Sequence, residues 1–105
     1  MQIQINTDKN IEGREALAEK IEGVMESSLS RFSDRITRLE IHLSDENGQK
    51  NGQEDKRCMI EARLSGRQPT SVTHQAATLD QAVEGAVEKL DRSLESTLGR
   101  LRDDS

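Results

Sequence analysis

Positively charged residues near the C-terminus recur along one side of a predicted helix, where they could bind a polyanion. On a helical wheel with about 100° per residue, Lys89, Arg92 and Arg100 share one flank, with the small residues Gly85 and Ser96 between them. Basic side chains neutralise phosphates, and small neighbours leave room for a nucleic-acid backbone. The acidic residues of this helix share the other flank: Glu84, Glu88, Asp91 and Glu95. The alternative is that these charges solvate the helix and form pairs such as Glu88 with Arg92.

A second predicted helix, residues 13–32, shows the same separation of charge. One of its flanks is basic, and the other is acidic. Two parallel helices would place the acidic flank of one against the basic flank of the other, whereas antiparallel helices would bring like charges together. The acidic flank of this helix consists of Glu15, Glu19, Glu22 and Glu26, and its basic flank of Lys20 and Arg31.

Residues spaced for catalysis or metal binding are missing from the sequence. It contains no Gly-rich phosphate loop, nucleophile motif or metal-ligand spacing. Cys58 lies in a strand-like run that favours a buried thiol over a reactive one, and His74 has no carboxylate or nucleophile spaced to serve it. We therefore predict a protein that is not an enzyme and has no cofactor, metal or small-molecule substrate.

Composition limits the kinds of nucleic acid that the chain could bind. Its net charge of -5 argues against indiscriminate binding, although residues 31–79 carry one more base than acid. Phe32 is the single aromatic residue, so platforms for stacking unpaired bases are absent and any RNA contact must involve phosphate and shape. No membrane span or signal peptide is evident, which predicts a cytoplasmic protein.

The periodicity of apolar residues predicts one domain over residues 1–105. Strict alternation indicates strands, and recurrence every three or four positions indicates amphipathic helices. Residues 45–55 contain two Asn-Gly pairs and no apolar side chain, which predicts a flexible hairpin loop, and residues 103–105 should fray. The strands are expected near 1–6, 36–44, 57–66 and 70–77, and the helices over 13–32 and from an N-cap at Thr78 to about residue 102.

The resulting order, βαβββα, predicts an α+β fold. Following the chain direction from element to element makes the two helices parallel. Because each strand is apolar on alternate residues only, one face of the four-stranded sheet should be covered, and both helices should pack on that face.

Three segments and their order resemble the ribosome hibernation promoting factor family, which includes the ribosome-associated inhibitor A proteins. The segments are MQIQI at 1–5, FSDRI at 32–36 and TLDQAVEGAVEKLDRSL at 78–94. The resemblance covers nearly the whole chain and implies a fold akin to double-stranded RNA-binding domains with an added first strand. It also implies a short-form bacterial stress factor that binds 16S ribosomal RNA of the small subunit, in the channel for transfer and messenger RNA, and silences or protects idle ribosomes.

The resemblance also implies which residues contact RNA. Family contacts come from bases on the helices, and Lys89, Arg92, Arg100 and Arg102 stand at matching positions; Lys20 and Arg31 complete the predicted RNA-binding set.

The sequence departs from the family in its last helix, where residues 96–99, Ser-Thr-Leu-Gly, replace a dense run of lysines. Fewer phosphate contacts mean a lower affinity at physiological salt. The alternative is therefore a protein-interaction module on the same fold that turns its acidic helix faces toward a basic partner protein. A homodimer through an exposed strand edge or the outer sheet face, where Met59 lies, is compatible with either hypothesis.

Overall fold

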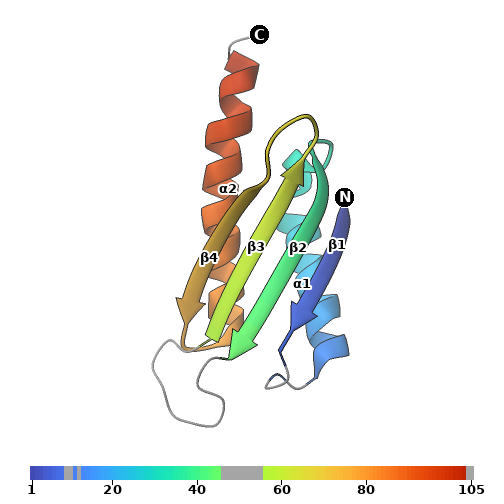
Figure 1. Cartoon of the computed structure of the whole chain (residues 1–105), viewed down its shortest axis with the longest axis vertical. Helices are drawn as coiled ribbons and strands as arrows, with labels where there is room; N and C mark the ends of the chain where they lie inside the picture. The colour runs from blue at the N-terminus through green and yellow to red at the C-terminus, as the bar shows by residue number, and fades with distance from the viewer. Residues whose placement is uncertain (9–10, 12, 46–55, 104–105) are drawn as a thin grey trace.

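The computed structural model describes residues 1–8, 11, 13–45 and 56–103, with side chains as far as Leu98. The predictions for residues 46–55 and 104–105 lie outside the described residues, and Asp45, which we expected in the loop, ends the second strand. Asp103, which we expected in the frayed tail, belongs to the last helix. In chain order the elements are β1 (Gln2–Thr7), α1 (Arg14–Ser28), the 3₁₀ turn η1 (Ser30–Phe32), β2 (Ile36–Asp45), β3 (Lys56–Leu64), β4 (Thr70–Ala76) and α2 (Leu79–Asp103) (Figure 1).

The four strands form one mixed sheet in the order β1-β2-β3-β4. β1 is parallel to β2, and the pairs β2–β3 and β3–β4 are antiparallel. Both helices lie on the same face of the sheet and run in the same direction (Figure 1). The predicted architecture, including the parallel helices, is therefore confirmed.

The core lies between the sheet and the two helices. α2 packs on β3 and β4, and α1 packs beside β1. Burying a Val, Leu, Ile or Met side chain stabilises a fold by about 1.5–3 kcal/mol. The apolar side chains buried between the sheet and the helices therefore hold the helices on the sheet. The most deeply buried side chains are Ile21, Met25, Leu29, Leu39, Ile41, Ile60, Leu90, Leu94 and Cys58.

α1 ends four residues earlier than its apolar periodicity predicts. The backbone leaves the helical region at Leu29, with φ -111° and ψ 17°, and continues as η1. Serines at positions 27, 28 and 30 favour this ending because their hydroxyls compete with helical hydrogen bonding. Phe32 stays buried nonetheless, because the amide of Phe32 bonds the carbonyl of Leu29 at 3.0 Å and the tighter turn points its ring inward.

The start of α2 agrees with the predicted N-cap. The hydroxyl of Thr78 accepts a hydrogen bond from the amide of Gln81 at 3.1 Å, which satisfies one of the free amides of the first turn. Within the described ranges, no helix is long and apolar enough to cross a membrane.

Candidate nucleic-acid interface

The charged side chains of α2 lie on two flanks that are separated by its buried stripe. Asp91 and Glu95 lie on the flank that faces the end of α1, and both contact Arg31. Lys89 lies on the opposite flank and donates a hydrogen bond to the carbonyl of Thr73 in β4, at 2.8 Å. The two signs of charge are thus separated across the helix, as the helical wheel predicts.

Ion pairs join the basic flank of α1 to the acidic flank of α2. Lys20 Nζ lies 2.9 Å from Asp80 Oδ1 near the start of α2. About three turns further along α2, Arg31 Nη2 lies 2.8 Å from Asp91 Oδ1 and Arg31 Nη1 lies 2.9 Å from Glu95 Oε2. The expected contact between oppositely charged flanks is therefore confirmed for the parallel helices.

Arg31 is held by more contacts than any other predicted RNA-binding residue with a described side chain. The hydrogen bond to Asp91 raises the pKa of the Arg31 guanidinium, and Coulomb attraction from Asp91 and Glu95 acts in the same direction. The guanidinium also lies 4.6 Å from the centre of the Phe32 ring, within cation–π range. A phosphate that binds Arg31 must therefore displace two carboxylates.

Lys89 and Arg92 are the predicted RNA-binding residues that no acid neutralises among the side chains that the structure describes. Both are exposed, and they are three residues apart and so neighbours on the helix surface. The bond from Lys89 to Thr73 leaves its charge uncompensated because the acceptor is a neutral carbonyl. The backbone of Arg100 and Arg102 belongs to α2, but the structure does not describe their side chains.

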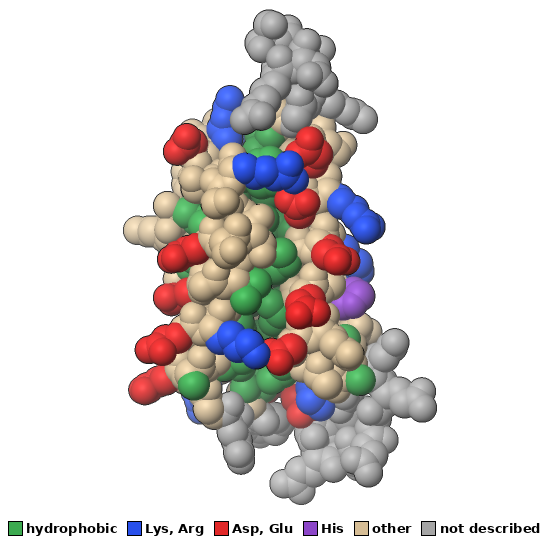
Figure 2. Space-filling view, turned by 180° about the vertical axis from the view of Figure 1, so that it is seen from behind, with side chains coloured by type: hydrophobic (Ala, Val, Ile, Leu, Met, Phe, Trp, Pro, Cys, Tyr) green, Lys and Arg blue, Asp and Glu red, His purple; other side chains and the backbone are tan. Residues whose placement is uncertain are grey.

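The four predicted residues with described side chains do not form one patch. Lys20 and Arg31 lie between the helices, whereas Lys89 and Arg92 lie on the other side of α2. Viewed from the helix side, an apolar strip separates the helices, and acidic and basic side chains lie together across it (Figure 2).

One expectation about the basic flank is wrong. We expected Gly85, which has no side chain, to leave room for a nucleic-acid backbone, but His74 of β4 occupies this space. A Cβ atom at Gly85 would lie 2.0 Å from Cδ2 of His74. Gly85 thus permits a close approach of α2 to the sheet, and the half-buried His74 serves packing.

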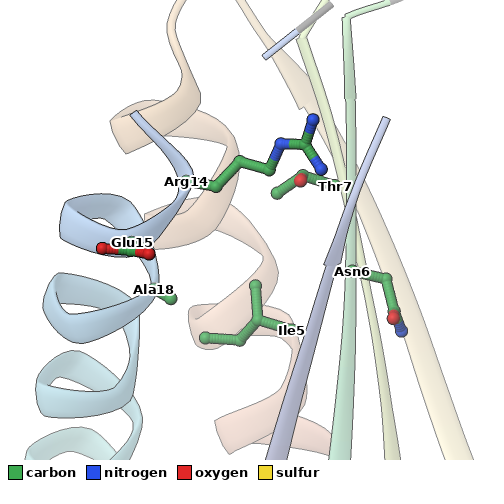
Figure 3. A pocket seen from close by; sticks show the side chains of 6 residues that line it. All are labelled: Ile5, Asn6, Thr7, Arg14, Glu15 and Ala18. Carbon is green, nitrogen blue, oxygen red and sulfur yellow. The ribbon is translucent and has the colours of Figure 1, made fainter. Parts of the chain in front are cut away.

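A surface hollow that the sequence did not predict lies at the other end of the helix layer. It measures about 390 Å³, and Ile5, Asn6 and Thr7 of β1 line one side of it (Figure 3). The first turns of α1 line the other side, where the small side chain of Ala18 keeps the hollow open. Ala18, which interrupts the glutamates on this flank, is the signal in the sequence that could have indicated it.

Side chains suited to metal or nucleophilic chemistry do not converge in the described part of the chain. No group of three His, Cys, Asp or Glu residues there could hold a metal ion. Cys58 is buried in β3, and its burial raises the pKa of the thiol to about 12, so the thiol remains protonated and unreactive at neutral pH.

Comparisons with known proteins support the fold. The N-terminal domain of Protein Y from Thermus thermophilus has a similar fold, with a TM-score of 0.72 and 23% identity over 92% of this chain and 99% of that one. A ribosomal subunit interface protein from Coxiella burnetii gives a TM-score of 0.73 and 19% identity over 94% and 99%. No curated protein matches the sequence. Residues 3–102 match the family described as Sigma 54 modulation protein / S30EA ribosomal protein, and the chain belongs to this family.

Proposed function

We propose that this protein binds 16S ribosomal RNA of the small subunit, in the channel used by transfer and messenger RNA, and silences or protects idle ribosomes in the cytoplasm. Membership of the family makes the chain a ribosome-associated protein of a non-enzymatic class, as the sequence predicts. The subunit, the RNA and the contact residues are the proposed part, for a single domain over residues 1–105.

The observation that carries the proposal is the pair of uncompensated cations on the β4 side of α2. Lys89 and Arg92 are exposed there, and neither forms an ion pair with an acid that the structure describes, whereas Asp91 and Glu95 of the same helix contact Arg31. A phosphate that approaches this side meets positive charge without first displacing a carboxylate. We assign the primary contact to Lys89 and Arg92 and extend it along the same helix to Arg100 and Arg102.

Lys20 and Arg31 take a secondary role in this proposal. Both are more than half exposed, at 60% and 53% of the side-chain surface, so RNA can reach them. Each must exchange a carboxylate for a phosphate, which reduces the net gain from every such contact. These two residues therefore add less to affinity than their charge suggests.

The test is co-sedimentation of the purified protein with ribosomes at low and physiological salt. We expect Lys89→Glu combined with Arg92→Glu to abolish co-sedimentation at physiological salt. The matched control is Arg35→Glu with Arg67→Glu, which changes the net charge equally at two exposed turn residues without a partner in the described structure. Equal loss in both variants, or no co-sedimentation of the unaltered protein at either salt concentration, would refute the proposed interface.

A further inference from the structure

The two edges of the sheet differ in how they are protected against pairing with another strand. At the β4 edge, Pro69 precedes the strand, and Lys89 donates a hydrogen bond to the outward-facing carbonyl of Thr73. β1, the sequence QIQINT, has neither a charged residue nor a proline. Natural proteins commonly block exposed edges with lysine, proline or other charges. The β1 edge lacks these devices and is therefore open to an added strand.

The direction of the β1 amides shows which backbone groups an added strand would meet. The amide of Asp8 donates to the carbonyl of Leu43 in β2 at 3.1 Å. Backbone groups of alternate residues point to opposite sides of a strand. The amides and carbonyls of Ile3, Ile5 and Thr7 therefore point away from β2, toward the open edge.

The hollow beside this edge offers space for side chains of an added strand. Ile5 points from β1 toward α1, and Ala18 faces it from the helix (Figure 3). Alternate side chains of an added strand would point toward the helix layer, so a small apolar side chain fits between Ile5 and Ala18.

The glutamates on the outer flank of α1 indicate that the occupant is positively charged. Glu15 lines the hollow, and Glu22 follows two turns later on the same flank. Both are exposed, and neither has an ion pair with any residue that the structure describes. Arg14 lies at the Thr7 end of the hollow, so basic side chains of an occupant fit along the glutamates and away from that end (Figure 3).

A second copy of this chain fits the edge poorly. Pairing β1 with β1 around a twofold axis would bring the acidic flanks of two α1 helices to the same seam, where their like charges repel. We propose instead that the β1 edge and the adjoining hollow bind an extended, lysine- or arginine-rich peptide of a partner protein, which adds as a fifth strand with small apolar side chains beside Ala18. This inference goes beyond the proposed RNA contact and uses the opposite side of the molecule.

The experiment uses the full chain and two synthetic peptides of seven residues with blocked termini, Thr-Lys-Thr-Val-Thr-Lys-Thr and Thr-Glu-Thr-Val-Thr-Glu-Thr, in which valine and both charged side chains project from the same face of the strand. Amide hydrogen exchange is followed by NMR. We expect the lysine peptide to slow exchange at Ile3, Ile5 and Thr7 and to leave β4 unchanged, and the glutamate peptide to have no effect. Equal protection by both peptides, or no protection of β1 by either, would overturn the proposal.

Two variants then test the charge and the hollow separately. Glu15→Lys with Glu22→Lys should weaken binding of the lysine peptide by about ten-fold, since two attractive contacts become repulsive. Glu84→Lys with Glu88→Lys makes the same change in net charge on α2 and should leave binding unchanged. Ala18→Leu fills the hollow and should weaken binding while preserving the fold, which circular dichroism verifies.

Equal weakening by both charge variants, or unaltered binding to Ala18→Leu, would contradict the assignment. Ribosome co-sedimentation of the Glu15→Lys with Glu22→Lys variant separates this inference from the proposed function. A failed peptide experiment does not affect the proposed ribosome contact, and a failed co-sedimentation experiment does not affect the proposed peptide site.

Discussion

Arg31 and Arg92 carry the same guanidinium group, but their neighbours give them different capacities to bind phosphate. Asp91 and Glu95 hold Arg31 at 2.8 and 2.9 Å, whereas Arg92 is exposed without an acidic partner in the described structure. Both look alike in the sequence as bases on helical flanks. The difference lies in the side chains that the other helix brings close.

Removing the two acids should release Arg31 for RNA. Asp91→Asn with Glu95→Gln keeps the shape of both side chains, and we expect ribosomes to bind this variant more tightly with a salt slope steeper by about one phosphate contact. Co-sedimentation over a series of salt concentrations measures both quantities. Glu19→Gln with Glu26→Gln on the outer flank of α1 is the control for net charge; an equal gain there would show that Arg31 is not the cause.

Individual residues were predictable from the sequence where the determinant is local. The N-cap at Thr78 and the separation of charge on each helix follow from neighbours along the chain, and the structure confirms them. The contact between Gly85 and His74 was not predictable, because the two residues are eleven positions apart and meet only when α2 docks on β4.

The docking of α2 on β4 depends on the missing side chain at Gly85. The ring of His74 fills the position that a Cβ atom would take, with three ring atoms within 2.5 Å of it. Because even the Cγ atom of His74 lies that close, a small rotation of the ring cannot relieve the contact. The helix can approach the edge of the sheet only while position 85 has no side chain.

We therefore expect Gly85→Ala to destabilise the protein by about 1–3 kcal/mol, the usual cost of overpacking. Urea unfolding measures this free energy. The control is Gly23→Ala in α1, where an added Cβ meets nothing within 4 Å and should stabilise by about 0.5–1 kcal/mol. Combining Gly85→Ala with His74→Ala should recover part of the loss, and additive losses in the double variant would rule out the contact as the cause.

At the level of elements, alternation and helical periodicity predicted the four strands and two α-helices of the described residues and their order, but not η1. The observed bounds differ from the expected ones by a few residues at most, with the largest difference at the end of α1. There, apolar spacing continues through Leu29 and Phe32 while the backbone tightens into η1. Periodicity reports which side chains are buried, and a 3₁₀ turn can bury the same ones.

Across the whole molecule, a net charge of -5 coexists with a locally positive side of α2. Ion pairs between the helices occupy Lys20 and Arg31, whereas Lys89 and Arg92 have no acidic partner in the described structure. The hollow at β1 and the distribution of free and paired cations depend on how far apart the helices stand, which the sequence pattern did not specify.

This distribution predicts a shallow dependence of ribosome binding on salt. If Lys89 and Arg92 make the main phosphate contacts, the logarithm of the affinity should fall with the logarithm of salt concentration with a slope of about 1.5, at roughly 0.7–0.9 per contact, and of about 3 if Arg100 and Arg102 contribute equally. Binding to purified 30S subunits between low and physiological salt tests this. A slope of about 5 or more would mean that the interhelical cations take part fully.

The carboxylates that pair with Lys20 and Arg31 should also affect how the protein dissociates from RNA. When RNA displaces Asp80, Asp91 or Glu95, these groups stay attached to the same scaffold instead of diffusing away as potassium or magnesium ions do. A tethered competitor acts at an effective concentration in the millimolar range. In the proposed complex it can recapture its cation each time a phosphate dissociates, so we expect these carboxylates to speed the release of the protein from RNA.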